Sequence, residues 1–312
     1  MSQQPAPRDS LFREGRMSVG LVLPIRATDT ENVDFREQVE LAALAEQLGF
    51  AAVWVRDVPL NGPWYPESFG HPDPFVMLGA IAATTSRIVI GTAATVLTLR
   101  HPLHIAKAAI SLDYLAPGRL VLGVGSGDRR EEFAAFGEDS NHRRELYRAH
   151  WAELAAALEQ PSRITRVVSD PAVDFELRPS AQSRIPMLAL GSGGQSLDWI
   201  ARNAPGWATY HRSPAVQQGR HELWRTAVER SAGGQFRSFS VALRIELLED
   251  QAAPAEDIEI GYRLGSRALV DVLESMRDAG THHALLNIVP NGMPARETLE
   301  LIARHVLPEN PS

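Results

Sequence analysis

The sequence predicts an α/β protein built as a closed (β/α)8 barrel, the TIM barrel fold. Three observations support this prediction: short apolar runs alternate with amphipathic segments, the alternation repeats eight times, and each short run is almost uniformly apolar. Uniformly apolar strands are typical of a parallel sheet that is covered by helices. Strict alternation fits either an open doubly wound sheet or a closed barrel, and eight units in about 290 residues favour the barrel.

The first four units follow a polar N-terminal stretch. The run at 19–24 ends at a proline, as a buried strand would, and the helix at 34–50 closes with a glycine. Asp73 is a predicted N-cap, with Pro74 at the first helical position. The strands of these units are expected at 19–24, 51–57, 87–95 and 119–125, and the helices at 34–50, 73–85, 102–115 and 142–160.

The alternation pauses between Pro161 and Arg184, where Pro, Ser and Arg are frequent. We interpret 161–185 as an insertion between units four and five, within a single barrel domain over 18–312 that follows a flexible lead-in at 1–17. The remaining strands are expected at 186–191, 206–210, 239–250 and 283–289, and the helices at 195–204, 215–231, 266–280 and 294–307.

Composition excludes several classes of function. A net charge of −7 and scattered basic residues argue against a nucleic-acid-binding protein. The absence of cysteine excludes disulfides and thiolate metal sites, and neither the His pair in "HPLH" (101–104) nor any H-E-x-x-H run predicts a metal site. No apolar run reaches the length of a membrane span, which is about 18 residues. The N-terminus lacks the apolar core of a signal peptide, so we expect a cytoplasmic protein.

A barrel of this kind carries its active site at the C-terminal ends of the strands. Any one residue there can be explained as a turn or a cap, but together these residues predict a polar, glycine-rich mouth. They are Arg56 and Asp57, Thr92 to Thr95, Gly125 to Asp128, Gly191 to Gln195, Tyr210 to Arg212, and Asn287.

Two glycine-rich loops follow predicted strands. In "GSGGQS", the backbone amides and the start of the next helix are suited to a phosphate, although a turn with a serine cap explains the same pattern. Its residues are Gly191, Ser192, Gly193, Gly194, Gln195 and Ser196. The loop "GVGSGD" is a weak dinucleotide motif, because Asp128 stands where G-x-G-x-x-G has its third glycine.

Carboxylates at strand ends leave a glycoside hydrolase open as an alternative of another class. Asp57 and Asp128, with Glu246 or Glu249, could supply the acid and base. Trp54 and Trp64 could stack against a sugar, but core packing or a cofactor wall explains them equally well. The histidines at 282–283 open a strand at the opposite end of the barrel, where a role in stability is expected.

The stretch "RHPLHIAKAAISLDYLAPGRLVLGVGSGDRREEFAAFG" (100–137) closely resembles the signature of the bacterial-luciferase-like flavin-dependent oxidoreductases. The segments "GFAAVWVRDVPL", "TSRIVIGTAATVL", "IPMLALGSGGQSLDWIARNAPGW" and "LLNIVPNG" are similar to other parts of the family, so the resemblance spans roughly residues 19–307. "WVRDVP" and "GDR" are typical of a subgroup, the short-chain luciferase-type oxidoreductases.

The resemblance implies a barrel that binds FMN, or in some branches a deazaflavin, at its C-terminal mouth. The flavin ring would lie at Ala93 and Ala94, where the family often has a cis peptide, with Thr95 at the ring edge. The loop Gly125, Ser126, Gly127 and Asp128 would pass the ribityl and phosphate side, and "GSGGQS" matches the family's phosphate-binding loop.

Two departures from the family pattern bear on the reaction. Luciferases carry a histidine just after strand two, where this chain has Arg56, Asp57 and Val58. An arginine that helps to bind phosphate in luciferase-type members is replaced by Ser126, and Arg129 is the nearest substitute in sequence. The histidine-assisted mechanism therefore does not carry over.

The resemblance implies an FMN-dependent monooxygenase that uses O2 and reduced flavin from a separate reductase on a small organic substrate. We take Arg56 and Asp57 as candidate catalytic residues that orient substrate or stabilise charge, with a structural salt bridge as the alternative. A deazaflavin-dependent hydride-transfer enzyme and a non-catalytic flavin-binding protein remain open. The loop at 59–72 and the insertion at 161–185 are expected to shape the substrate pocket, and we expect a homodimer.

Overall fold

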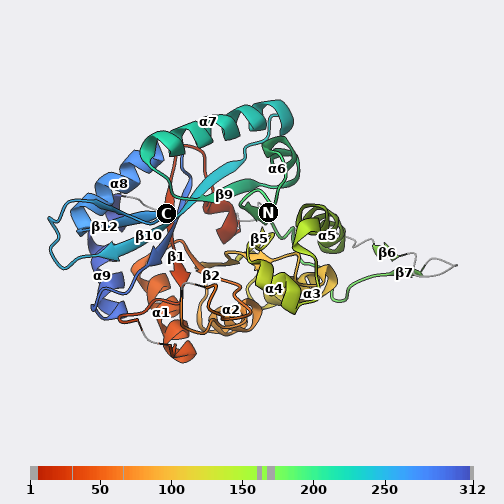
Figure 1. Ribbon diagram of the computed structural model, residues 1–312, viewed down its shortest axis with the longest axis horizontal. Helices are drawn as coiled ribbons and strands as arrows, with labels where there is room; N and C mark the ends of the chain where they lie inside the picture. The colour runs from red at the N-terminus through yellow and green to blue at the C-terminus, as the bar shows by residue number, and fades with distance from the viewer. Residues whose placement is uncertain (1–5, 30, 66, 160–163, 167–172, 310–312) are drawn as a thin grey trace, which may run out of the picture.

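The computed structural model describes residues 6–29, 31–65, 67–159, 164–166 and 173–309 (Figure 1). Strands are hydrogen-bonded side by side in parallel around a full circle, because the last strand pairs with the first. This confirms the predicted (β/α)8 barrel. The eight strands in order around it are β1 (Ser18–Leu23), β2 (Ala52–Val55), β3 (Val89–Thr92), β5 (Leu120–Gly125), β8 (Met187–Leu190), β9 (Gly206–Tyr210), β10 (Ser238–Leu247) and β13 (His283–Ile288).

The helices between these strands cover the outside of the barrel (Figure 1). They are α1 (Phe35–Leu48), α2 (Pro74–Thr84), α3 (Pro102–Leu115), α5 (Arg143–Leu158), α6 (Leu197–Asn203), α7 (Pro214–Ser231), α8 (Ser266–Asp278) and α9 (Ala295–His305). The predicted start of α2 is confirmed, since Asp73 accepts hydrogen bonds from the amides of Phe75 and Val76 and Pro74 is the first helical residue.

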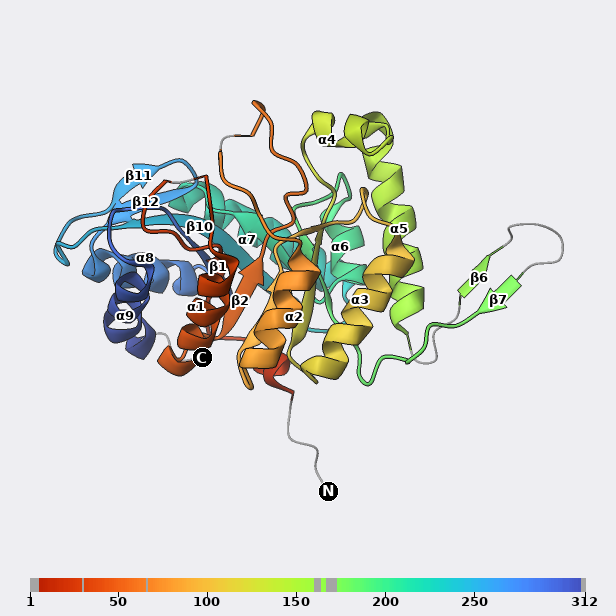
Figure 2. The same ribbon diagram turned by 90° about the horizontal axis from the view of Figure 1, so that it is seen from below.

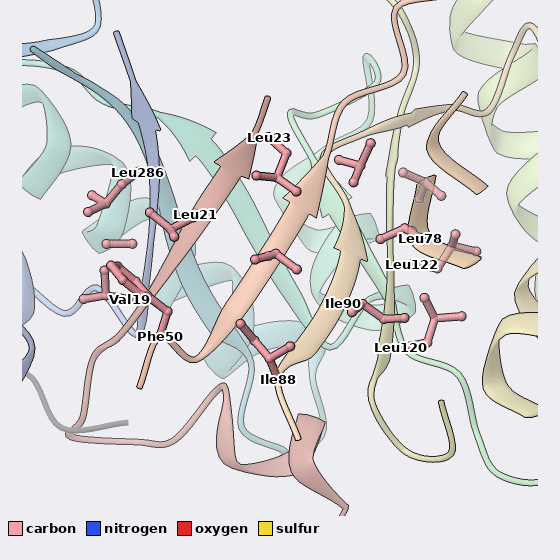
Figure 3. Close-up of a cluster of buried hydrophobic side chains, with 14 of the residues drawn as sticks. Val19, Leu21, Leu23, Phe50, Leu78, Ile88, Ile90, Leu120, Leu122 and Leu286 are labelled. Atoms are coloured by element: carbon pink, nitrogen blue, oxygen red, sulfur yellow. The ribbon is translucent and has the colours of Figure 1, made fainter. Parts of the chain in front are cut away.

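The main hydrophobic core lies between the barrel and this helical layer. Figure 3 shows Leu21, Ile90 and Leu122, from three different strands, among its buried side chains. Because successive side chains of a strand point to opposite faces, the intervening residues point into the barrel. They form a second cluster that fills its lumen: Val22, Ala52, Trp54, Val89, Val121, Leu188, Ala208 and Leu285, together with Leu11 from the N-terminal segment.

The N-terminal segment closes the lower end of the barrel, which is the end where the parallel strands begin. Pro7–Ser10 form a 3-10 turn, the following Leu11 is only 2% exposed, and Arg8 is paired with the buried Asp113 at 3.0 Å. The sequence led us to expect a flexible segment over 1–17, and this packing was not predicted. Residues 1–5 lie outside the described ranges. The histidine at this end is structural: His283 is completely buried between Ser18 Oγ (2.7 Å) and Trp54 Nε1 (2.9 Å).

Several elements add to the eight units. The predicted strand at 87–95 divides into β3 and β4 (Thr95–Val96), and α4 (Arg130–Ala135) follows β5. The antiparallel hairpin of β11 (Glu256–Ile258) and β12 (Gly261–Leu264) pairs with the upper half of β10. Short 3-10 turns lie at Ser140–His142 and Leu307–Glu309.

The predicted insertion contains an antiparallel pair, β6 (Ile164–Arg166) and β7 (Val173–Phe175), that projects sideways from the barrel (Figures 1 and 2). The rest of the expected segment at 161–185 lies in part, at 161–163 and 167–172, outside the described residues. Figure 2 shows the loop after β2, α4 and the β11–β12 hairpin gathered at one end of the barrel, and the N-terminal segment at the other. Among the described helices, none combines the length and apolar character needed to cross a bilayer.

Candidate active site

Strand geometry brings the sequence-predicted residues to one opening. Trp54, Ala208 and Leu285 belong to the lumen cluster, and two residues further along each strand the side chain points to the same side. The lumen at the C-terminal end of the barrel is therefore lined by residues of several strands, among them Arg56, Ala93, Gly125, Tyr210 and Asn287.

Small residues occupy the part of the mouth formed by β3, β4 and β5. The Ala93–Ala94 peptide bond is cis, at the place where the resemblance implied one. Thr95 follows it and is completely buried, and its Oγ1 has no hydrogen-bond partner among the residues that the structure describes. A methyl group added to Gly125 would lie 3.1 Å from Ala94 Cβ, a tight contact, so the glycine lets these two segments approach closely.

The loop after β8 is held open by backbone conformations that favour glycine. The φ angles of Gly191, Gly193 and Gly194 are all positive. A side chain on Gly193 would collide with the ring of Tyr147 at 2.6 Å, whereas a side chain on Gly191 would meet nothing within 4 Å. Gly191 therefore borders open space, where a ligand can approach the backbone.

Two members of this loop have structural roles. Gln195 is buried, and its Nε2 donates to the carbonyls of Arg144 (2.9 Å) and Gly193 (3.1 Å), which fixes the loop against α5. Ser196 caps α6, because its Oγ accepts from the amide of Trp199, as the serine-cap alternative required. Ser192 is exposed, and its Oγ accepts from the Gly194 amide at 3.3 Å.

The start of α5 lies between the two glycine-rich loops. Arg143 Nη1 donates to the carbonyl of Gly127 at 3.0 Å, and the side chain of Arg144 packs against Gly194. Sequence reasoning missed these two cations, although "HRRELYR" at the start of a helix beside a phosphate loop is a signal that could have found them. Arg129, which we had considered for this role, lies elsewhere, over the ring of Tyr65 at 4.1 Å.

Arg56 and Asp57 do not form a pair. Asp57 is buried and accepts hydrogen bonds from Arg100 Nε and Nη2, both at 2.8 Å, and from the Val96 amide at 3.0 Å. Its carboxylate therefore faces the outside of β2 and fastens β4 to the barrel. The structural salt bridge expected as the alternative for Arg56 and Asp57 is therefore not formed between them: Asp57 pairs with Arg100, and Arg56 with Glu67.

Arg56 belongs to a polar cluster that closes one side of the mouth. Its Nη1 lies 2.9 Å from Glu67 Oε2, which also accepts from Tyr65 Oη at 2.8 Å and contacts His71 Nε2 at 3.2 Å. Burial alone would raise the pKa of Glu67, but its hydrogen bonds to His71 and Arg56 outweigh burial and hold the pKa well below its usual range. Burial lowers the pKa of His71, so its neutral ring donates to a Glu67 carboxylate.

The carboxylates that glycoside hydrolysis requires are not assembled. Asp57 is bound by Arg100, Asp128 is 76% exposed, and Glu246 is paired with Arg263 at 3.2 Å. Trp54 is completely buried in the barrel, where it cannot stack against a sugar. Within the described ranges, no group of three or more His, Asp or Glu side chains is placed to hold a metal ion.

Comparison with known proteins decides the family. The sequence model described as luciferase-like monooxygenase matches residues 17–266. This chain belongs to the luciferase-like monooxygenase family. The resemblance inferred from the sequence is thereby confirmed, and with it the class of the protein, an oxidoreductase.

Curated relatives of this chain include proteins named as F420-dependent and proteins without a known function. An F420-dependent glucose-6-phosphate dehydrogenase of Kribbella flavida is 31% identical over 206 residues, which is 61% of each chain. An uncharacterised protein of Mycobacterium tuberculosis is 32% identical over 156 residues, 47% of this chain and 52% of its own. This luciferase-like chain thus spans only half to three fifths of the length of these relatives.

Solved structures share the fold. The monooxygenase RslO1 from Streptomyces bottropensis superimposes with a TM-score of 0.77 at 20% identity, over 94% of this chain and 99% of that one. An F420-dependent secondary alcohol dehydrogenase, solved with an F420-acetone adduct, gives a TM-score of 0.76 at 16% identity over 95% and 100% of the two chains. At such identities the likeness establishes the barrel and not the reaction.

Proposed function

We propose that this luciferase-like protein is an FMN-dependent monooxygenase that acts on a small organic substrate. The observation that carries the proposal is the small-residue part of the mouth, Ala93, Ala94 and Gly125, with the buried Thr95 Oγ1 next along the chain and without a hydrogen-bond partner among the described residues. The open backbone at Gly191 lies on the next strand around the barrel.

The residues present fit such a cofactor. Thr95 Oγ1 would hydrogen-bond the ring edge, and the backbone of Gly191 to Gly194 would bind the phosphate. Arg143 and Arg144 would supply the positive charge that Ser126 cannot. Reduced FMN, when bound, supplies the electrons with which O2 is activated for oxygen transfer.

The two candidate catalytic residues receive different roles. Asp57 is a positioning residue, because it holds Arg100 and the Val96 amide and so keeps Thr95 in place. Arg56 stays in the lumen, where its guanidinium, oriented by Glu67, would stabilise negative charge on the reacting groups. The loop around Tyr65 and Glu67, packed on Arg129, would limit the access of water.

A deazaflavin-dependent hydride transfer is the second candidate. One observation favours it: several relatives of this chain are named as F420-dependent glucose-6-phosphate dehydrogenases, one of them 43% identical over 98 residues in Beutenbergia cavernae. The same barrel mouth would hold the deazaflavin ring, and the reaction would then need no oxygen.

Further partners and the compartment belong to the proposal. The helix α2, "PFVMLGAIAAT", is apolar almost throughout, and its Val76 is 74% exposed, which suits contact with a second copy in a homodimer. A separate reductase would supply reduced FMN in the cytoplasm.

Parallel titration with FMN, reduced FMN and F420, followed by flavin fluorescence, tests the cofactor. Gly191→Ala and Gly233→Ala form a matched pair, since both glycines have positive φ and open space for a methyl group, but Gly233 lies far from the mouth, after α7. We expect at least about tenfold weaker FMN binding for Gly191→Ala and unchanged binding for Gly233→Ala. Preference for F420 would favour hydride transfer over oxygen transfer. FMN binding without oxygen-dependent turnover would indicate a non-catalytic flavin-binding protein. If none of the three compounds binds, the cofactor site is refuted.

A further inference from the structure

The mouth has a second part, formed by β9, β10 and β13, whose lumen-facing residues are polar. Tyr210 and Asn287 were predicted at this opening, and Arg244 of β10 joins them. Ala242 packs against the lumen cluster, so Arg244, two residues later on the same strand, points to the same side. A substrate that lies next to a cofactor in the small-residue part would meet these side chains.

Arg244 and Asn287 are direct neighbours. They are register partners of the parallel strands β10 and β13, so their Cα atoms lie about 4.8 Å apart and their side chains leave the sheet on the same face. Tyr210 lies on β9, where it is the register partner of Ala242. Ala242 precedes Arg244 by two residues on β10, so Tyr210 lies slightly deeper in the lumen than Arg244. The three side chains thus line one continuous wall.

The charge of Arg244 is compensated more weakly than the charges of Arg56 and Arg129. Arg56 is held by Glu67 at 2.9 Å, and Arg129 by the buried Glu132 at 2.9 Å. Within the described ranges, the one carboxylate that contacts Arg244 is that of Glu259, at 3.5 Å, and it is 83% exposed. Exposed pairs at such distances contribute little to stability, so a ligand can displace this contact easily.

The side-chain amide of Asn287, next to Arg244, is also available to a ligand. In the described part of the chain, no side-chain hydrogen bond involves Asn287, although it is only partly exposed. Tyr210, which is 57% exposed, adds a phenol hydroxyl beside them that can donate a hydrogen bond. A planar guanidinium fork beside an amide NH2 group offers two donors to the two oxygens of a carboxylate.

We propose that Arg244 and Asn287 form a subsite for a carboxylate group of the substrate, so that this enzyme acts on a small carboxylic acid. This inference rests on the proposed function, because it takes the small-residue part of the mouth as the place of the cofactor. Arg244 and Asn287 are then substrate-binding residues that set specificity.

The test compares acids with their amides on the FMN-loaded protein. Monocarboxylates from acetate to benzoate and the matching primary amides are titrated, and binding is followed by calorimetry and by the visible absorbance of bound FMN. Inorganic phosphate is a further probe. The variants are Arg244→Met, Arg244→Lys and Asn287→Ala, with Arg225→Met, a 64% exposed arginine on α7, as the matched control for loss of one charge.

We expect at least one acid to bind about tenfold more tightly than its amide, a preference that Arg244→Met and Asn287→Ala reduce and that Arg225→Met leaves unchanged. Arg244→Lys keeps the positive charge but loses the two parallel N–H donors of the guanidinium, so it should retain part of the preference for the acid. Equal binding of every acid and amide, or an unchanged preference in Arg244→Met, would overturn the inference. Phosphate that binds more tightly than every acid would also overturn the carboxylate assignment.

Flavin binding separates this outcome from failure of the proposed function. All Arg244 variants should bind FMN within about twofold of the parent protein, because the residue lies outside the cofactor part. If the parent binds no flavin, the proposed function fails, and the acid-to-amide comparison on the protein without flavin still decides the subsite. If Arg244→Met does not fold, Arg244→Lys and Asn287→Ala carry the test.

Discussion

Replacing Asp57 with Asn separates a positioning role from direct participation in catalysis. The carboxylate accepts three hydrogen bonds, two from Arg100 at 2.8 Å and one from the Val96 amide at 3.0 Å, and its side chain is 2% exposed. An asparagine keeps the shape but turns an NH2 group toward one of these donors. Arg100 then loses its buried charge partner and keeps only the more exposed Asp73 among the described residues.

The magnitude follows from the burial of the two partners. Breaking a fully buried ion pair costs about 3–5 kcal/mol. Arg100 is 29% exposed and keeps its second contact, to Asp73 at 2.8 Å, so we expect a loss of about 2–3 kcal/mol in the free energy of unfolding after allowing for solvent screening. In a chain of this size that corresponds to a fall in Tm of about 5–10 °C.

Urea unfolding followed by circular dichroism measures this loss, and flavin titration measures its effect on the site. Asp73→Asn is the matched control: Asp73 contacts the same arginine but is 41% exposed, and asparagine can still cap α2, so its cost should stay below about 1 kcal/mol. A double variant with Arg100→Met should reveal a coupling of about 2 kcal/mol between Asp57 and Arg100. If Asp57→Asn is as stable as the parent protein yet inactive, the positioning role is refuted.

Three further predictions concern stability and the phosphate loop. Burial alone would raise the pKa of Glu46, but hydrogen bonds from the amides of residues 86–88 outweigh it and lower the pKa to about 2. The carboxylate therefore adds about 1–2 kcal/mol to the free energy of unfolding, after allowing for its exposure. This stabilisation is present above the unfolded pKa of 4.5 and is lost as the pH falls toward 2. Urea unfolding of Glu46→Gln should find the full difference from pH 7 to about pH 5 and a clearly smaller one at pH 3, and a constant difference would contradict it. Gly193→Ala should lower stability by about 1–3 kcal/mol and weaken FMN binding, because its methyl would meet the Tyr147 ring at 2.6 Å; a thermally unchanged variant would argue against this contact. Burial lowers the pKa of His283 to about 3, so between pH 6.5 and 3 the unfolded chain binds a proton that the folded chain does not, and stability falls as the pH drops below 6.5. His283→Gln should flatten this part of the plot of unfolding free energy against pH. An identical plot for the variant would exclude His283 as the cause of the fall.

The backbone of this fold could be predicted because its signals are local. The eight strand-and-helix units, the cap at Asp73 and the helix-ending glycine at 49 are written in short stretches of sequence. The hairpin of β11 and β12 was missed, since its two strands are short and read as a connection between the strand at 239–250 and the next helix. The packed turn at Pro7–Ser10 was missed because its partner, Asp113, lies about a third of the chain away.

The candidate site could be located but not resolved into roles. Strand ends direct attention to the mouth, yet adjacent residues of a strand face opposite sides, so Arg56 and Asp57 could not both enter the lumen. The partner of Asp57, Arg100, is 43 residues further along the chain, and only the folded barrel brings them together. The same alternation, counted from Ala242, would have found Arg244.

The closure of the lower end by Leu11 has a kinetic consequence. Because Leu11 fills that end among the described residues, the cofactor, substrate and product of the proposed enzyme would all pass through the mouth. A ligand that binds second would obstruct the departure of the first. For the proposed enzyme we therefore expect steady-state patterns with two varied ligands to be those of an ordered and not a random sequence.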